Sequence, residues 1–332
     1  MRRLGISIYP EHATLEENKK YIEQAARYGF KRIFTCLLSV DKPKEEVKAE
    51  FKELIDYAHE KGMEVILDVA PYVFERLGIT YDDLSFFADI HADGIRLDEG
   101  FNVLSYKPNT DYVLTCHNFY PQRYSGLGYK MFEETSKRIR QHNLPIAAFV
   151  SSQQPDTFGP WNVYEGLCTL EMHRDLPIDL QARHLFATGL VDDVIIANCF
   201  ASEEEMKALS EIEPGKLTFR IELEGEPNEA EEKILFEHPH FARGDMNDYA
   251  ARSTMPRITY KDASIPARNT RDLKRGDIVI VNENYDRYKG ELHVVLKDMP
   301  NDGKKNVVAH LPEEELILLD YLDAWKTFAF KK

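Results

Sequence analysis

The stretch PKEEVKAEFKELIDYAHEKGMEVILDVA, residues 43–70, contains the structural unit from which the fold follows. Residues 43–62 carry apolar side chains at helical spacing, and Gly62 stands where a helix is expected to end. Residues 64–70 form a short apolar run typical of a buried strand. An amphipathic helix followed by such a strand is the repeating element of a parallel sheet with crossover helices.

This unit recurs along the first two thirds of the chain. Eight apolar runs read as strands: LGISIY, RIFTCLL, EVILDVA, DGIRLD, YVLTCHNF, PIAAFVSS, CTLEMHR and DDVIIAN. Amphipathic segments lie between most of them. A count of eight favours a closed (β/α)8 TIM barrel of the α/β class over an open doubly wound sheet. The glycine fingerprint of dinucleotide-binding sheets is absent after the first run, where YPEHAT stands instead.

From about Glu213 onward the alternation stops. KLTFRIELEG, GDIVIVNENYDRYKGELHVVL and NVVAHLP read as antiparallel strands, with a hairpin loop over residues 282–290. We therefore predict a barrel domain over residues 1–215 and a small all-β domain over residues 216–332.

Composition excludes several classes of partner. The chain has 332 residues and a formal net charge of −15, which argues against nucleic acid or an anionic membrane surface as the main partner. The four cysteines are scattered and form no CxxC pair. The sequence contains no run of about 18 apolar residues, so we expect no segment that spans a bilayer. The N-terminal MRRLGISIYPE lacks the apolar segment of a signal peptide, so we expect a cytoplasmic protein.

The segment TLEMHRD, residues 169–175, places charged groups at the end of a predicted barrel strand. On a strand, Leu170 and Met172 would face the helices, and the two residues alternating with them would face the lumen. Other strand ends repeat this pattern. The residues expected at the inner rim are Glu11, Asp68, Arg96, Asp98, His117, Asn118, Glu171 and His173. Because TIM-barrel sites lie at the carboxyl ends of the strands, this gathering predicts an active site.

Paired carboxylates at such a rim suit glycoside cleavage, in which one acid protonates the leaving oxygen and a second carboxylate attacks or activates water. Asp98 and Glu171, on the fourth and seventh predicted strands, are the candidate catalytic pair. The alternative is an ion-pair network of Arg96 with these two carboxylates that only fills the lumen. A metal site built from the histidines and carboxylates is a rival, but no spacing such as HExxH supports it. We expect neither a metal nor another cofactor.

Three arginines are candidates for holding an anionic group. Arg174 follows the seventh predicted strand, where barrels often bind phosphate. Arg243 and Arg252 lie in HFARGDMNDYAARSTMPR, residues 240–257, of the second domain, which we expect to contribute to the substrate site. Guanidinium groups bind phosphate or carboxylate through two N–H donors. Surface ion pairs with Asp245 and Asp248 are the alternative explanation.

Several long motifs resemble one bacterial family. They are GISIYPE, CHNFYPQRYSGLG, LCTLEMHR, FARGDMNDYAARSTMPR and LKRGDIVIVNENYDRYKGELHVVL. The chain is similar over nearly its whole length to proteins once called outer surface proteins and now classed as 6-phospho-N-acetylmuramidases. The resemblance implies a TIM barrel followed by a cyclophilin-like β-barrel. It also implies hydrolysis of the bond between N-acetylmuramic acid 6-phosphate and N-acetylglucosamine, a disaccharide of cell-wall (peptidoglycan) recycling imported by a phosphotransferase system.

Two other functions stay open at this point. The first is another phosphosugar enzyme, an isomerase or aldolase, although no lysine falls in the eight apolar runs to form a Schiff base. The second is a non-catalytic binding protein, for which a cyclophilin-like fold is weak evidence. The expected partner is a phosphorylated disaccharide. The sequence does not decide whether the hydrolysis follows a retaining, an inverting or a substrate-assisted route. It also does not decide whether the protein forms a homo-oligomer.

Overall fold

The computed structural model describes residues 2–37, 42–80, 82–97 and 113–332. The chain divides into two compact units, Met1–Glu211 and Ile212–Lys332. Each unit has its own sheets and core, and each is described by itself.

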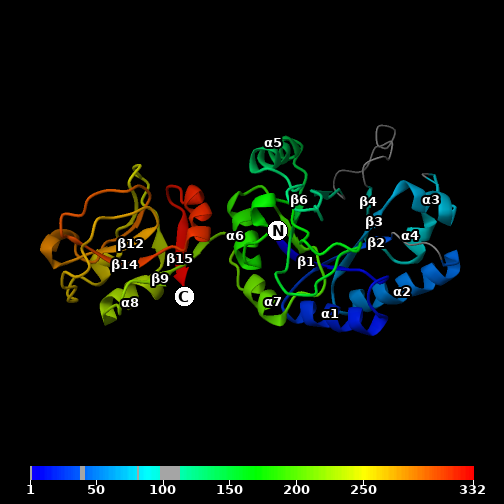
Figure 1. Cartoon of the computed structure of the whole chain (residues 1–332), viewed down its shortest axis with the longest axis horizontal. Helices are drawn as coiled ribbons and strands as arrows, with labels where there is room; N and C mark the ends of the chain where they lie inside the picture. The colour runs from blue at the N-terminus through cyan, green and yellow to red at the C-terminus, as the bar shows by residue number, and fades with distance from the viewer. Residues whose placement is uncertain (1, 38–41, 81, 98–112) are drawn as a thin grey trace. The chain divides into compact units, whose positions relative to one another are not determined.

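The described residues of the first unit form a seven-stranded sheet of parallel pairs in the order β4-β3-β2-β1-β7-β6-β5. Figure 1 labels β1, β2, β3, β4 and β6 of this sheet. Its strands are β1 (Arg3–Ile8), β2 (Arg32–Leu37), β3 (Glu64–Val69), β4 (Gly94–Leu97), β5 (Thr115–Cys116), β6 (Ile146–Val150) and β7 (Asp193–Ile196). Gly5 on β1 is paired with Arg32 on β2 and, on the other side, with Ile195 on β7.

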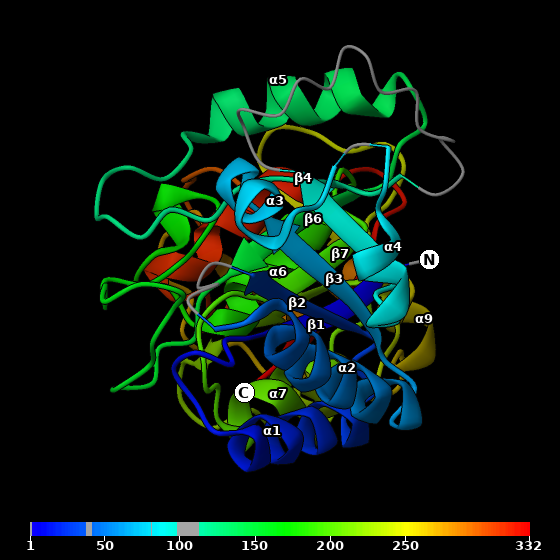
Figure 2. The same ribbon diagram turned by 90° about the vertical axis from the view of Figure 1, so that its right-hand side faces the viewer.

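The helices of this unit follow the strands and cover the outside of the sheet. They are α1 (Leu15–Arg27), α2 (Lys44–Glu60), α3 (Pro71–Leu77), α4 (Ser85–Asp89), α5 (Tyr129–Arg140), α6 (Ile178–Ala187) and α7 (Glu203–Ser210). Figure 2 shows α1 and α2 beside β1, β2 and β3. Thr14 begins α1 with a capping box to Glu17, which satisfies backbone N–H groups that have no partner within the helix.

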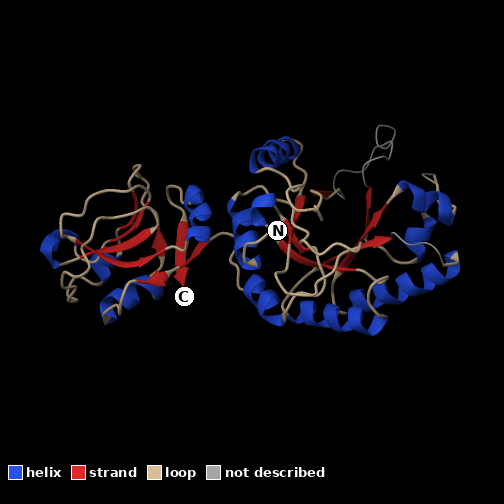
Figure 3. Cartoon of the chain, viewed as in Figure 1, coloured by secondary structure: helices blue, strands red, loops and turns tan. Residues whose placement is uncertain are grey.

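Contacts across the inside of the sheet show that it curves into a near-closed barrel (Figure 3). The rings of Phe34 on β2 and Phe149 on β6 lie 5.0 Å apart, although β1 and β7 separate these strands in the sheet. Phe119, just after β5, contacts both rings. Among the described residues the edge strands β4 and β5 are not paired, yet Arg96 on β4 donates a hydrogen bond to Asn118 after β5. The predicted α/β barrel class is confirmed.

The predicted seventh strand is wrong. Cys168 and Leu170 form only isolated bridges, with Tyr120 and Leu127, and Glu171–His173 is the short 3₁₀ helix η3. The side chains of Cys168 and Leu170 are fully buried, so the alternation of apolar residues here reflects packing of a loop and not of a strand. The strand assignment of residues 168–174 therefore fails, and so does the inward direction predicted for residues 171 and 173.

The second unit has a three-stranded sheet, β10-β15-β8, and a five-stranded sheet, β11-β13-β12-β14-β9. The pairs are antiparallel except that β8 runs parallel to β15, so the antiparallel prediction is wrong for β8. Its strands are β8 (Leu217–Arg220), β9 (Glu222–Leu223), β10 (His240–Phe241), β11 (Ala250–Ser253), β12 (Asp277–Val281), β13 (Leu292–Val295), β14 (Lys305–His310) and β15 (Thr327–Lys331). The helical segments are α8 (Glu229–Phe236), α9 (Pro256–Thr259), η4 (Glu283–Tyr288) and η5 (Glu313–Tyr321). The predicted hairpin is confirmed as β12 and β13, joined through η4. Leu273, Val279, Val295 and Val307 form a core cluster in this unit.

Across the ranges given above, no helix has both the length and the apolar character needed to cross a membrane.

Candidate active site

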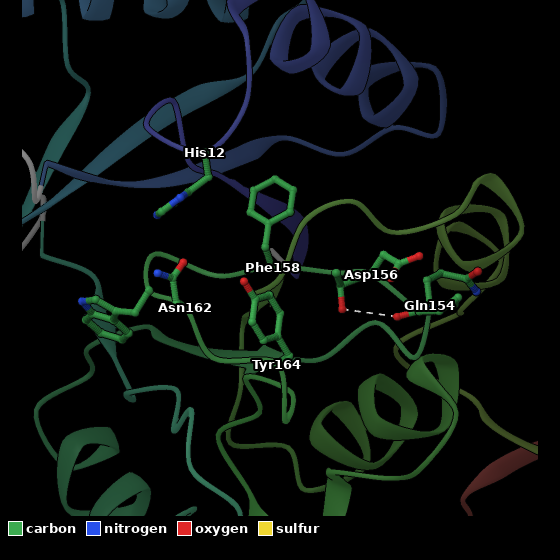
Figure 4. Close-up of a pocket in the computed structure, with 9 residues that line it drawn as sticks. His12, Gln154, Asp156, Phe158, Asn162 and Tyr164 are labelled. Atoms are coloured by element: carbon green, nitrogen blue, oxygen red, sulfur yellow. Dashed lines mark hydrogen bonds between the residues drawn. The ribbon is translucent and has the colours of Figure 1, made fainter.

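A pocket of about 660 Å³ opens at the carboxyl end of the barrel strands. His12 comes from the segment after β1, and the other lining residues come from the long segment between β6 and α6 (Figure 4). The lining is His12, Gln154, Pro155, Asp156, Thr157, Phe158, Trp161, Asn162 and Tyr164. This is the end of a parallel barrel at which substrate sites are found.

His12 is fixed at the pocket by a hydrogen bond and a ring contact. Its Nε2 lies 3.1 Å from the carbonyl oxygen of Pro160, which can only accept, so Nε2 donates. In the neutral ring Nδ1 is then an acceptor. The imidazole also lies 6.2 Å from the ring of Phe158. In Figure 4 His12, Asn162 and Tyr164 surround the pocket, which gives it amide, phenol and imidazole groups suited to hydroxyl ligands.

Aromatic rings supply the apolar part of the lining. Trp161 is 48% exposed and lies against Phe119 at 5.9 Å, so its indole is held by the barrel interior while part of it stays accessible. Tyr164 is 69% exposed. Phe158 packs edge to face on Tyr9 and Phe200. Amphipathic rings of this kind provide faces on which a sugar ring can lie.

The segment that carries the pocket is anchored to the strand ends by backbone hydrogen bonds. Phe158 exchanges two of them with Cys199, at 2.7 and 2.9 Å. Asn198 accepts from the N–H of Ser152 and donates to Thr157 Oγ1. A site whose supports are fixed in this way loses little entropy when it binds a ligand.

Asp68 and Arg96 meet inside the barrel, as their strand positions predicted. Arg96 Nη1 lies 2.5 Å from Asp68 Oδ1, and Cys36 Sγ lies 3.6 Å from Asp68 Oδ2. Asn118 joins this group by accepting from Arg96. Asp98, the first member of the predicted catalytic pair, lies outside the described residues. Glu11 is exposed in the segment after β1, next to His12 in the chain.

Glu171 is held as an ionised carboxylate. It accepts from Arg174 at 2.7 and 2.6 Å and from the N–H groups of Tyr124 and Gly126, both at 2.7 Å. These hydrogen bonds, chiefly those from Arg174, lower the pKa of Glu171 to about 2. A Cβ at position 126 would lie 2.6 Å from Glu171 Oε2, so glycine is needed there. Such a carboxylate is unsuited to act as a general acid near neutral pH.

Arg174 uses its guanidinium to hold the surrounding loops. Besides the two bonds to Glu171, it donates to four backbone carbonyl groups, those of Tyr120, Gln122, Glu165 and Gly166. Its side chain is only 2% exposed. Because all five N–H donors are engaged, this arrangement gives no support to the predicted phosphate-binding role.

His117 and His173 both face helices instead of the lumen, contrary to prediction. His117 Nε2 lies 2.8 Å from Ser136 Oγ on α5, and burial lowers the pKa of His117 to about 4. His173 Nε2 lies 2.7 Å from His184 Nδ1 on α6, and burial lowers the pKa of His173 well below its usual value. Asp68 and Glu171 are bound to separate arginines, so these two carboxylates and the two histidines do not gather into the metal site considered as a rival.

Arg243 and Arg252 lie in the second unit and share the carboxylate of Asp245. Asp245 Oδ1 is 2.6 Å from Arg243 Nε and 3.3 Å from Arg252 Nη2. The ion pairs with Asp245, given above as the alternative explanation, are therefore present. Binding of an anion by these two arginines stays a prediction.

Sequence reasoning missed the polar part of the pocket. It did not select His12, Gln154, Asp156 or Asn162. The available signal was the long segment SSQQPDTFGPWNVYEG after the sixth strand, which mixes turn residues, amides and aromatic rings.

The comparisons with known proteins cover both units. Models of the 6-phospho-N-acetylmuramidase family match at its N-terminal part, residues 4–104 and 101–211, and at its C-terminal part, residues 217–331. An uncharacterized B. cereus protein of known crystal structure is 45% identical, with a TM-score of 0.91, and the match covers 100% of this chain and 99% of that one.

A conserved Enterococcus faecalis protein of unknown function shares the fold at 24% identity and a TM-score of 0.74, over 99% of this chain and 96% of that chain. A search of curated proteins finds no significant match.

Proposed function

This chain belongs to the 6-phospho-N-acetylmuramidase family and is a glycosidase, and from that premise we propose its substrate and its site. The proposed reaction is hydrolysis of the bond between N-acetylmuramic acid 6-phosphate and N-acetylglucosamine. We place this reaction in the cytoplasm, in the recycling of cell-wall fragments, because a sugar phosphorylated during import is met inside the cell.

The pocket at the barrel mouth is the observation that carries the proposal. It combines partly exposed aromatic faces, Trp161 and Tyr164, with the polar groups of His12 and Asn162. Saccharides require this combination, since their C–H faces lie on aromatic rings while their hydroxyl groups need hydrogen-bond partners. A volume of about 660 Å³ lies within the range of small-ligand sites.

The chemistry requires an acid and a second carboxylate. Glu171, with a pKa of about 2, is negatively charged at neutral pH, so it suits only the role of the anionic partner. Asp98, which follows β4 in the sequence, remains our candidate for the general acid. Glu11, Asp68, Arg96 and Asn118 are proposed to position substrate at the rim.

Paired substrates test the assignment. Purified protein is incubated with the phosphorylated disaccharide and with the same disaccharide lacking phosphate, and released N-acetylglucosamine is measured. We expect hydrolysis of the phosphorylated substrate to be at least a hundredfold faster in kcat/KM. Equal rates on both substrates would contradict the phosphate requirement.

Asp98→Asn and Glu171→Gln test the catalytic pair. We expect Asp98→Asn to reduce kcat by at least a thousandfold at an unchanged melting temperature. If Glu171 acts only by holding its loop, Glu171→Gln will lower stability and activity together. A normally folded Glu171→Gln protein with full activity would remove Glu171 from the mechanism.

A further inference from the structure

A second surface that combines an aromatic ring with cationic groups lies on the C-terminal unit, where the chain passes from one sheet to the other. Ala242 exchanges backbone hydrogen bonds with the β15 side, accepting from Trp325 and donating to Lys326. The next residue, Arg243, donates its N–H to the carbonyl oxygen of Arg252 on β11. The passage therefore brings Trp325 and the two arginines to one place.

Trp325 is displayed at this surface at a cost in free energy. Its side chain is 69% exposed and its φ is +66°, a backbone conformation that bulky residues rarely adopt. The indole stacks on Phe241 with 6.2 Å between ring centroids and lies directly over Gly244. A Cβ at position 244 would be 2.3 Å from the indole, so the glycine makes room for the ring.

The two arginines beside the ring are oriented by one carboxylate. The carboxylate of Asp245 forms ion pairs with Nε of Arg243 and with one terminal nitrogen, Nη2, of Arg252. The two terminal NH₂ groups of Arg243 have no partner among the residues placed by the structure, and the Arg243 side chain is 43% exposed. Two guanidinium groups sharing one carboxylate keep a local positive charge in a chain whose net charge is −15.

We propose that Trp325, Arg243 and Arg252 form a binding site for a saccharide that carries an oxyanion. The sugar ring would lie on the exposed indole, and the phosphate or carboxylate of the same sugar would take the free N–H donors of Arg243. The choice of a saccharide rests on the proposed function, whose substrate has both groups on its muramic acid. All three residues belong to the C-terminal unit.

The two tryptophans of the chain allow each site to be observed alone, because Trp161 lines the barrel pocket and Trp325 lies at this surface. In full-length Trp161→Phe protein, all tryptophan emission comes from Trp325. Four sugars are titrated: N-acetylmuramic acid 6-phosphate, N-acetylglucosamine 6-phosphate, N-acetylmuramic acid and N-acetylglucosamine. We expect saturable changes with the sugars that carry an anion and none with N-acetylglucosamine. N-acetylglucosamine 6-phosphate and N-acetylmuramic acid, which carry one kind of anionic group each, distinguish phosphate from carboxylate.

Arginine variants in the same background test the anion contact. We expect Arg243→Gln and Arg252→Gln to weaken binding at least tenfold. Arg275→Gln is the matched control, since Arg275 is a half-exposed arginine of the same unit paired with Asp320, and its variant should bind as before. Circular dichroism spectra of all variants should superimpose.

An unchanged Trp325 emission with every sugar would overturn the proposal, and so would an equal response to N-acetylglucosamine or equal weakening by Arg275→Gln. Hydrolysis of the phosphorylated disaccharide, measured on the wild-type protein, separates this result from the proposed function. Turnover without a Trp325 response refutes the second site alone. A Trp325 response without turnover refutes the proposed reaction and leaves the binding site standing.

Discussion

Arg96 on β4 donates a hydrogen bond to Asn118, which follows β5, and so links the two edge strands of the sheet, between which the described residues form no backbone pairing. The same guanidinium binds Asp68 on β3 at 2.5 Å. One side chain therefore links three segments of the barrel interior.

We expect Arg96→Met to lower the free energy of unfolding by about 3 kcal/mol, because it removes a cation from a mostly buried carboxylate. Asn118→Ala should cost about 1 kcal/mol. Urea denaturation of both single variants and the double variant gives their coupling energy. Arg123→Met is the control, since its bidentate pair with Asp175 is exposed and should contribute about 0–1 kcal/mol. Equal losses for Arg96→Met and Arg123→Met would contradict the linking role.

Two glycines only two residues apart make a matched pair. A Cβ at Gly126 would lie within 2.9 Å of the backbone N and Cα of Glu171, whereas at Gly128 it would meet nothing within 4 Å. We expect Gly126→Ala to destabilise the protein by about 2 kcal/mol and Gly128→Ala by less than about 1 kcal/mol. Thermal melts compare them directly. Similar melting temperatures would show that the loop around Glu171 moves to accept the methyl group.

The depressed pKa of Glu171 predicts a stability change in acid. Its ordinary pKa is near 4.3, and in the folded protein it is about 2, so the stability that it contributes is present above about pH 4.3 and is lost as pH falls toward 2. After solvent screening we expect about 1–2 kcal/mol. Urea denaturation of wild type and Glu171→Gln should differ at pH 6 and converge near pH 2. A difference that persists unchanged at pH 2 would contradict this assignment.

His117 predicts an effect at higher pH. Burial lowers its pKa from about 6.5 to about 4, so the unfolded chain binds the proton first. The stability associated with the neutral ring is complete above about pH 6.5 and is lost as pH falls toward 4, by about 3 kcal/mol. An NMR titration of the imidazole should give the low pKa. His117→Leu should remove this part of the pH dependence, and a titration near pH 6.5 would refute the buried position.

The pocket residues should affect activity without affecting stability. We expect His12→Ala and Asn162→Ala each to lower kcat/KM on the phosphorylated disaccharide about tenfold, which corresponds to loss of one hydrogen bond of about 1.4 kcal/mol. Met131→Ala, at an exposed residue of α5, is the control. If all three proteins hydrolyse the substrate at the wild-type rate, the site lies elsewhere.

The sequence alone determined the alternation of helices and strands, the α/β barrel class and the later antiparallel region. These features follow from local periodicity, as in residues 43–70 and in the hairpin around residues 282–290, where neighbours in the chain decide the structure. The same local patterns placed Asp68 and Arg96 in the lumen correctly, because both lie on true strands.

Only the tertiary structure decided the rest of the site. Residues 168–174 alternate like a strand, but of their apolar side chains only Cys168 and Leu170 are buried, where the chain bridges Tyr120 and Leu127, while Met172 is 42% exposed. Glu171 is bound by groups up to 47 residues away in sequence. His117 turns to α5 for the same reason, since its partner Ser136 lies on another element. The periodicity of apolar residues predicts which side chains are buried. Which segment packs against each of them depends on contacts between parts of the chain that are distant in sequence.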